Sequence, residues 1–167
     1  MFVPGALSAG DKPMSFTFLH SRADEPSIEV PAIGLTLRVP LPPAASDGAM
    51  TVIETINAPG FGPPLHRHNE TEIFRVLEGR YLFECDGKRF EAGVGDVVTI
   101  PGGAAHAFVN ITDQPARQFI IIAPGLDAVA FFTGLANVMK DGLPNRDLLS
   151  AFGRQWGVEF LGPPLKP

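Results

Sequence analysis

The sequence predicts an all-β fold of short antiparallel strands that ends in two helices, and three observations support this class. Four glycines recur every eight residues, at Gly79, Gly87, Gly95 and Gly103, which is the spacing of one short strand plus one tight turn. The 18 glycines and 17 prolines among 167 residues leave little room for long helices. After residue 125 the apolar residues change to a helical spacing. An antiparallel sandwich or barrel is therefore expected.

Length, charge and cysteine content limit the classes of function. A chain of 167 residues has the length of one domain. Its 13 Lys and Arg are outnumbered by 18 Asp and Glu, and the resulting net charge of -5 argues against nucleic acid and anionic membranes as partners. Cys85 is the single cysteine, which excludes an internal disulfide and fits a small buried hydrophobic residue.

No membrane association is expected from the sequence. The N-terminus lacks the basic and apolar regions of a signal peptide, so the expected location is the cytoplasm. The most apolar stretch, residues 119–132, is interrupted by Pro124, Gly125 and Asp127 and is shorter than the roughly 20 residues that span a bilayer.

The first third of the chain predicts an arm followed by short strands. Residues 1–15 are rich in Gly, Pro and Ser and are expected to form an N-terminal arm. Strands bounded by Pro, Gly or Asp are predicted at 15–19, 28–30, 35–39 and 51–56, with an exposed loop over 40–48. The barrel is expected to occupy residues 16–125.

The middle of the chain predicts a regular hairpin. Asp86-Gly87 is a dipeptide that tolerates positive φ at both central positions of a two-residue turn. The residues before it alternate between apolar and polar, which places Tyr81, Phe83 and Cys85 on the inner face.

Two helices are predicted in a C-terminal extension over residues 126–167. Helical spacing relates two apolar sets, which are Ala128, Phe131, Phe132 and Leu135, and Leu148, Leu149, Phe152 and Trp156. Asn145 stands where an N-cap belongs, and Gly157 stands where a helix ends. The aromatic stripes of these helices are expected to be core that packs against the sheets.

Three of the 4 histidines form the most informative pattern in the chain. His66 and His68 alternate along a predicted strand, so both imidazoles point to one side and can converge on one ion, whereas Arg67 points away. Glu72 lies too far along a straight strand to join them, about 13 Å from His68, so the chain must turn at residues 69–71. His106 follows Gly103 at the start of a further strand.

Strand parity brings these side chains to one interior. Beyond the turn, Glu72, Phe74 and Val76 share a face, and His106, Phe108 and Asn110 have the same inward parity. From the residues alone, a metal site and a set of separate histidines satisfied by hydrogen bonds or solvent are equally open interpretations.

Three further polar residues have simpler interpretations. Glu70 could replace Glu72 as a ligand, but its place in the turn favours a solvated carboxylate. His20 is expected at the surface or in the core, and Asn110 is expected to brace a hairpin rather than to touch substrate.

The spacing of these residues resembles a known family. The segments Gly60-x5-His66-x-His68-x3-Glu72-x6-Gly79 and Gly95-x5-Pro101-x-Gly103-x2-His106-x3-Asn110 are similar to the paired motifs of the cupin superfamily. The resemblance implies that His66, His68, Glu72 and His106 are metal ligands. It also implies a cupin double-stranded β-helix, a small jelly-roll barrel, ahead of the C-terminal helices.

A second resemblance concerns the end of the chain. The stretches Ala123-Pro124-Gly125-Leu126 and 156–164 resemble small single-domain cupins grouped with the flavonol (quercetin) 2,3-dioxygenases. No residue of this tail is expected to contact a metal.

The expected cofactor is one divalent transition metal ion per chain. Three neutral imidazoles and one carboxylate favour Fe, Mn, Co, Ni, Cu or Zn over Mg or Ca, and the sequence does not choose among these ions. A homodimer is also expected, because a set of apolar residues is predicted on the outer face and needs cover. That set is Ile73, Leu77, Val98 and Ile100.

The predicted function is a metal-dependent dioxygenase that acts on a small aromatic or enolic, flavonol-like substrate. The ligand set leaves one or two metal positions open for a substrate oxygen and dioxygen, and Glu72 is the candidate proton acceptor. The expected substrate-binding wall is apolar and consists of Phe74, Val76, Tyr81, Phe83 and Phe108.

Two alternatives stay open, a non-catalytic cupin that binds a small ligand and a metal-assisted isomerase or hydrolase. Arg67 and Arg75 project outward by parity, so no cationic anchor for a sugar phosphate is predicted.

Overall fold

The computed structural model describes residues 15–167 and confirms an all-β fold with two C-terminal helices. The strands form two antiparallel sheets, β1-β2-β3-β10-β5-β8 (the first sheet) and β11-β4-β9-β6-β7 (the second sheet). The strand bounds are β1 (Ile28–Val30), β2 (Leu35–Leu41), β3 (Thr51–Asn57), β4 (Pro64–Arg67), β5 (Thr71–Glu78), β6 (Arg80–Cys85), β7 (Lys88–Gly93), β8 (Val97–Ile100), β9 (His106–Asn110), β10 (Ala116–Ala123) and β11 (Glu159–Pro164). The helices are α1 (Ala128–Val138) and α2 (Arg146–Trp156), with short 3-10 turns at Pro31–Ile33 and Pro43–Ser46.

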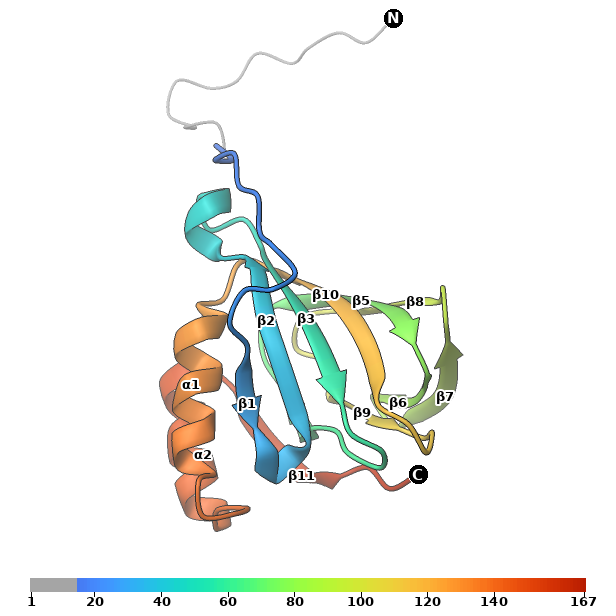
Figure 1. The fold of residues 1–167 in the computed structure, drawn as a ribbon. Coiled ribbons are helices and arrows are strands. Elements are labelled where there is room, and N and C mark those ends of the chain that lie inside the picture. The colour runs from blue at the N-terminus through green and yellow to red at the C-terminus, as the bar shows by residue number, and fades with distance from the viewer. Residues whose placement is uncertain (1–14) are drawn as a thin grey trace, which may run out of the picture.

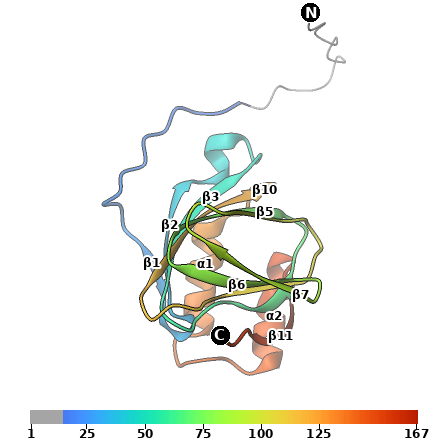
Figure 2. The same ribbon diagram turned by 90° about the vertical axis from the view of Figure 1, so that its right-hand side faces the viewer.

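The two sheets face each other across an interior filled by alternating side chains. Figure 2 shows β3, β10 and β5 lying across from β6 and β7. Strand β10 illustrates the alternation, since every second residue from Ala116 to Ile122 is buried. Four aromatic residues meet in the core at ring-centroid distances of 5.3–6.2 Å, namely Phe74, Tyr81, Phe83 and Phe108.

The predicted hairpin is confirmed. Cys85 pairs with Lys88 across the β6–β7 turn, and Asp86 and Gly87 adopt φ of 47° and 78°. Both central positions therefore have the left-handed backbone of a two-residue hairpin turn, which Asp and Gly adopt more readily than other residues.

Both predicted helices are confirmed, together with the residues predicted to begin and end the second one. The Asn145 side chain accepts a hydrogen bond from the Leu148 amide at the start of α2, and Gly157 is left-handed at its end. Helix α1 packs beside β1, and α2 packs beside β11 (Figure 1). The helices thus cover one flank of the barrel.

Three predictions about local structure are wrong. Residues 15–19 form no strand, and Phe18 is 93% exposed. The expected loop over 40–48 contains a 3-10 turn whose Ser46 is fully buried, because its hydroxyl donates to the Met50 carbonyl. The expected helical extension also contains a strand, since β11 pairs with β4 and completes the second sheet.

The predicted outer face is also partly wrong. Val98 and Ile100 are buried in the core, because they pair directly with Phe74 and Glu72 of β5 and therefore share the inward face. Of the four apolar residues expected outside, only Ile73 and Leu77 remain there, and both are half-buried.

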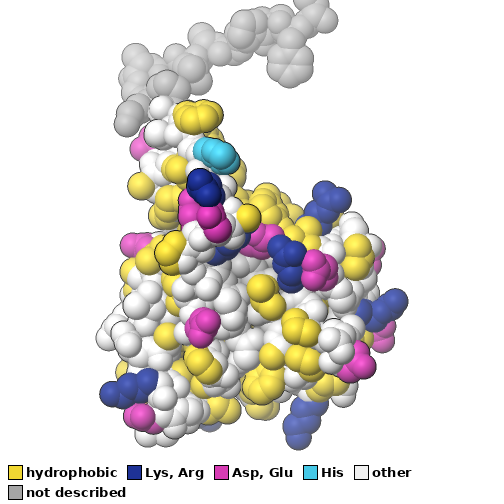
Figure 3. Space-filling view, viewed as in Figure 1, with side chains coloured by type: hydrophobic (Ala, Val, Ile, Leu, Met, Phe, Trp, Pro, Cys, Tyr) yellow, Lys and Arg dark blue, Asp and Glu magenta, His cyan; other side chains and the backbone are white. Residues whose placement is uncertain are grey.

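The outer surface mixes charged and hydrophobic side chains. On the face seen in Figure 3, side chains of both signs lie between hydrophobic ones. Among the described ion pairs, Arg38 and Arg117 both pair with Glu54, and Arg117 also pairs with Glu78. Within the part of the chain that the structure describes, no helix is long and apolar enough to cross a membrane. The arm predicted at residues 1–15 lies, apart from Ser15, outside the described residues.

Candidate metal centre

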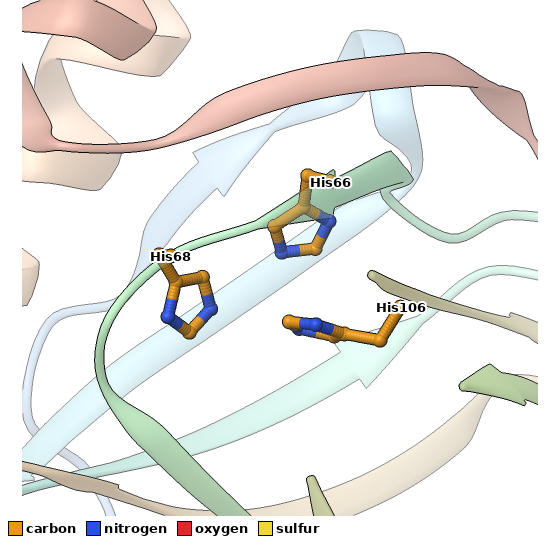
Figure 4. A group of neighbouring side chains, drawn as sticks. All are labelled: His66, His68 and His106. Carbon is orange, nitrogen blue, oxygen red and sulfur yellow. The ribbon is translucent and has the colours of Figure 1, made fainter. Parts of the chain in front are cut away.

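Strand pairing brings the three predicted histidines together. His66 on β4 pairs directly with His106 on β9, and their ring centroids lie 4.3 Å apart. His68 follows β4, with its ring 5.5 Å from that of His66 and 5.0 Å from that of His106. One nitrogen from each ring lies within 4.8 Å of the other two, and Figure 4 shows the three imidazoles converging on one space. The predicted convergence is therefore observed.

Glu72 joins the cluster from the neighbouring strand. The chain turns between Arg67, the last residue of β4, and Thr71, the first residue of β5, as the spacing predicts. The Glu72 Oε2 atom lies 3.0 Å from His106 Nε2 and 3.7 Å from His68 Nε2. Glu72 thus contacts the same nitrogens that face the centre of the histidine cluster.

The far side of each ring is oriented by another group. His66 Nδ1 lies 2.8 Å from the Pro64 carbonyl oxygen, and His106 Nδ1 lies 3.0 Å from the Ala104 carbonyl oxygen. An N–H that donates to a carbonyl at Nδ1 leaves the Nε2 lone pair free for an ion. His68 Nδ1 lies 3.1 Å from Glu70 Oε2. Glu70 therefore approaches the outer side of one histidine, whereas Glu72 lies on the inner side of two.

The histidine cluster opens on a cavity of about 110 Å³. This volume holds several water-sized groups, and so a small organic molecule, since one water needs roughly 10–15 Å³ on the same measure. Its walls are otherwise mainly apolar and come from β2, β3, β5, β9, β10, β11 and both helices.

The predicted substrate wall is only partly at the cavity surface. Phe74 and Phe108 line the cavity. Val76, Tyr81 and Phe83 are buried in the core and do not belong to the lining. Arg67 and Arg75 are predicted to project outward, and both are exposed. Arg67 forms an ion pair with Glu159.

Much of the wall comes from residues that sequence reasoning assigned to the core. Phe131, Phe132 and Leu135 of α1, Trp156 of α2 and Phe160 of β11 all line the cavity. The Phe160 ring lies 6.3 Å from that of His66, so the tail approaches the histidine cluster. The helical spacing identified most of these apolar stripes, but spacing alone does not say what a stripe faces.

Asn110 has the role expected of it. Its side chain accepts from the Thr112 amide and donates to the carbonyls of Asn57 and Gln114, so it braces the turn after β9. Cys85 is half-buried and packs against the core.

Comparison with known families agrees with this geometry. Residues 53–122, which contain all four candidate ligands, match the family described as Cupin domain. KdgF from Halomonas sp. superposes with a TM-score of 0.59 and 16% identity, over 68% of this chain and 98% of that one. The chain has the cupin fold. Together these matches support its membership of the cupin superfamily.

The curated relatives that this chain matches differ in their names. The chain is 35% identical over 68 residues to the uncharacterized protein MJ1618 of Methanocaldococcus jannaschii, covering 40% of this chain. It is 32% identical over 124 residues to the oxidoreductase OpS7 of Beauveria bassiana, covering 70% of this chain. It is 32% identical over 90 residues to the polyketide synthase CurC of Streptomyces cyaneus, covering 53% of this chain. The matches span 54%, 36% and 57% of these relatives' own lengths.

Two further solved structures share the cupin fold. A predicted oxalate decarboxylase from Thermotoga maritima has a TM-score of 0.51 and 25% identity, over 54% of this chain and 80% of that one. The polyketide cyclase RemF from Streptomyces resistomycificus has a TM-score of 0.55 and 24% identity, over 65% and 80%. One fold thus accompanies oxidoreductase, decarboxylase and cyclase names.

Burial and proximity set the charges within the histidine cluster. Desolvation, reinforced by the nearby His106, lowers the pKa of His66 from 6.5 to about 3, so His66 is neutral near pH 7. Burial opposes the charge of Glu72, but hydrogen bonds from His106 and His68 prevail and lower its pKa. Burial also opposes protonation of His68, yet Glu72 and Glu70 raise its pKa.

The residues present fit a divalent transition metal. Three imidazole nitrogens and an ionised carboxylate converge, and backbone carbonyls hold two of the rings with Nε2 facing inward. Borderline nitrogen donors with one carboxylate suit first-row transition metals better than Mg or Ca. His66, His68, His106 and Glu72 are therefore the residues that would hold the ion.

Proposed function

We propose that this cupin is a metal-dependent dioxygenase that acts on a small aromatic or enolic, flavonol-like substrate. One observation carries the proposal: His66, His68 and Glu72 of the cluster line a cavity that is walled largely by aromatic and aliphatic side chains. The ionisable side chains of the cavity are thus concentrated at the histidine cluster, and the apolar remainder of the wall suits a flat hydrophobic ring system.

The composition of the wall favours this substrate class over phosphorylated sugars. Among the described residues, the cavity lining contains no Lys or Arg. An anionic phosphate would therefore lack a cationic anchor there. The ionisable groups of the lining are Glu70, Glu72, His66 and His68, and carboxylates repel an anion.

The protein side chains have separable roles in the proposed reaction. A bound transition metal would supply Lewis acidity toward an enol or phenol oxygen and an electronic route to dioxygen. Glu72 is ionised at neutral pH and lies inside the cluster, so it is the group placed to accept the substrate's hydroxyl proton. Phe74 and Phe108 pack against the substrate rings, while Val76, Tyr81 and Phe83 support them from behind.

The name of one relative supports an oxidative reaction. OpS7 of Beauveria bassiana is named an oxidoreductase, and its match extends over 70% of this chain. The match spans only 36% of OpS7, so we propose an oxidative reaction for this chain but do not attribute the whole activity of OpS7 to it.

Oxygen uptake tests the proposal. The protein is reconstituted anaerobically with Fe, Mn, Ni, Co, Cu or Zn, and each form is mixed with quercetin and air-saturated buffer in an oxygen electrode. We expect one dioxygen consumed per quercetin with at least one redox-active metal, and strongly reduced uptake in Glu72→Gln. If quercetin binds but no form consumes oxygen, and Glu72→Gln changes affinity alone, the protein is a ligand-binding cupin instead.

A non-oxidative ring closure is the second candidate function. The 32% identity to a polyketide synthase, CurC of Streptomyces cyaneus, favours it. Polyketide chains are enolisable, so the same metal and carboxylate could promote cyclisation by moving protons. Product formation from a poly-β-ketone without oxygen uptake would favour this candidate over the dioxygenase.

A further inference from the structure

The three imidazoles of the cluster differ in what holds their outer nitrogen. His66 and His106 lie in strands, and a backbone carbonyl oxygen lies within 3.0 Å of the Nδ1 atom of each. His68 follows the end of β4, and within residues 15–167 no backbone carbonyl is bonded to its Nδ1 atom, which is buried. Buried polar atoms in proteins nearly always have a partner, so the orientation of the His68 ring depends on another group.

Glu70 is the acidic side chain beside this nitrogen. Its Oε2 atom lies 3.1 Å from His68 Nδ1, which is within hydrogen-bonding distance, and a small rotation of the carboxylate would align the two groups. The His68 side chain is 9% exposed and the Glu70 side chain is 23% exposed, so water screens the pair only partly. In Figure 4, one ring nitrogen of His68 faces the other imidazoles and the other nitrogen faces away from them. Glu70 therefore stands where it can hold the ring from outside.

The turn that carries Glu70 is fixed by the loop that precedes β9. The Gly103 amide donates to the His68 carbonyl at 2.7 Å, and the Gly102 amide donates to the Thr71 hydroxyl at 3.2 Å. A Cβ at Gly102 would lie 2.1 Å from a carbonyl oxygen of the turn, so the loop and the turn are in close contact. The backbone on both sides of Glu70 is therefore held in place, and its side chain starts from a fixed position beside His68.

Two other roles considered for Glu70 fit the geometry less well. A metal ligand belongs on the inner side of the rings, where Glu72 contacts the Nε2 atoms of His68 and His106. Glu70 instead approaches the outer nitrogen of His68. A freely solvated carboxylate would be exposed, whereas Glu70 is partly buried against that ring.

We propose that Glu70 is a positioning residue of the metal centre, whose carboxylate accepts a hydrogen bond from the Nδ1–H of His68 and keeps the Nε2 lone pair directed at the ion. A neutral imidazole carries one N–H and one lone pair, so an acceptor at Nδ1 selects the tautomer that binds a metal through Nε2. Groups that hold a ligating histidine in this way typically contribute roughly 10–100-fold to metal affinity. The inference rests on the metal centre of the proposed function and requires no particular substrate.

Zinc affinity tests this role without substrate or turnover. Metal-free wild type and variants are titrated with zinc against a competing chelator at one fixed pH. Glu70→Ala removes both the acceptor and the negative charge, and it should bind zinc roughly 10–100-fold more weakly. Glu70→Gln keeps an acceptor oxygen at nearly the same place and should fall between Glu70→Ala and wild type. Glu91→Gln removes an exposed carboxylate of β7 that pairs with Arg80, so it is the matched control and should bind zinc like wild type.

Cobalt-loaded protein gives a readout that a purely structural role would not change. The N–H protons of imidazoles bound to paramagnetic cobalt have strongly shifted NMR signals, and each signal disappears when its proton exchanges rapidly with water. We expect three such signals in wild type. In Glu70→Ala the signal of His68 should be lost, whereas those of His66 and His106, which face backbone carbonyls, should remain.

The outcomes separate the positioning role from the proposed function. If Glu70→Ala binds zinc like wild type, the role is wrong while the metal centre stands, even if the variant melts at a lower temperature. Weaker zinc binding with all three N–H signals kept would show that Glu70 acts on the ion directly and would also refute the role. If wild type binds no zinc, both inferences fall, whereas metal-loaded wild type that consumes no oxygen overturns the dioxygenase alone. Should Glu70→Ala not fold, Glu70→Met keeps the side-chain length and provides the same two comparisons.

Discussion

The buried imidazole of His66 makes the metal-free protein sensitive to acid. Its pKa is about 3 in the folded protein, against 6.5 for an unperturbed imidazole, chiefly because burial disfavours its charged form. Below pH 6.5 the unfolded chain protonates this residue, whereas the folded chain keeps it neutral until about pH 3. The unfolded state therefore binds more protons in this window, and the free energy of unfolding falls as pH falls.

The size of the effect follows from the width of the window. Each unit of pKa difference corresponds to about 1.4 kcal/mol. Between about pH 7 and about pH 4, roughly 2.5 pH units lie below the pKa of the unfolded imidazole and above that of the folded one. Over this range the free energy of unfolding falls by about 3 kcal/mol. This is a large part of the roughly 5–15 kcal/mol by which domains are stable.

Urea unfolding of chelator-treated protein at the two pH values measures this loss. Wild type should lose about 3 kcal/mol more than His66→Gln, whose amide does not titrate. His20 is exposed, so His20→Gln is the matched control and should follow wild type. Equal losses in wild type and His66→Gln would refute the assignment of a buried, neutral His66.

Three further predictions follow from the fold and the cluster. His106→Ala should abolish stoichiometric metal in elemental analysis, whereas His20→Ala should retain it; unchanged metal in His106→Ala would contradict the assigned ligand set. A Cβ at Gly62 would lie 1.8 Å from the Phe108 carbonyl oxygen, so Gly62→Ala should lower the melting temperature by roughly 4–10 °C. Gly93 has open space and should tolerate Ala, and equal melting temperatures for the two variants would contradict this packing. A homodimer remains the expectation from the sequence, with Ile73 and Leu77 left on the outer face; sedimentation at micromolar concentration should show it, and a single species of monomer mass would exclude it.

Much of the histidine cluster could be predicted from the sequence because it depends on local rules. Alternation along a strand places His66 and His68 on one side, and the need for a turn before Glu72 follows from strand length. Strand parity gives His106 an inward direction, but only the pairing of β4 with β9 brings it beside His66. Local periodicity fixes which side chains share a face, but not which strands become neighbours.

The inward direction of Val98 and Ile100 shows the same limit. Alternation correctly places these residues on a common face of β8. Whether that face points inward depends on the β5–β8 register, in which Val98 opposes Phe74. A register shift by one residue would turn both side chains to the outer face, and the local sequence does not determine the register.

Strand β11 could not be predicted for a different reason. Its sequence contains Gly162, Pro163 and Pro164, which are unfavourable in a central strand. An edge position tolerates them, because one side of an edge strand makes no ladder hydrogen bonds. The strand lies at the edge of the second sheet, paired only with β4 in the described chain. Long-range pairing thus overrides an unfavourable local composition.

The cavity is divided between two parts of the chain, and this division bears on which ligands it can accept. The matched cupin region, residues 53–122, supplies all four candidate metal ligands. The opposite wall comes largely from beyond that region, from Phe131 of α1, Trp156 of α2 and Phe160 of β11. The candidate metal ligands therefore belong to the barrel, whereas the shape offered to a ligand depends on the C-terminal helices and strand. Relatives that share the barrel can carry different activities for this physical reason, since a wall outside the barrel can change without moving a ligand.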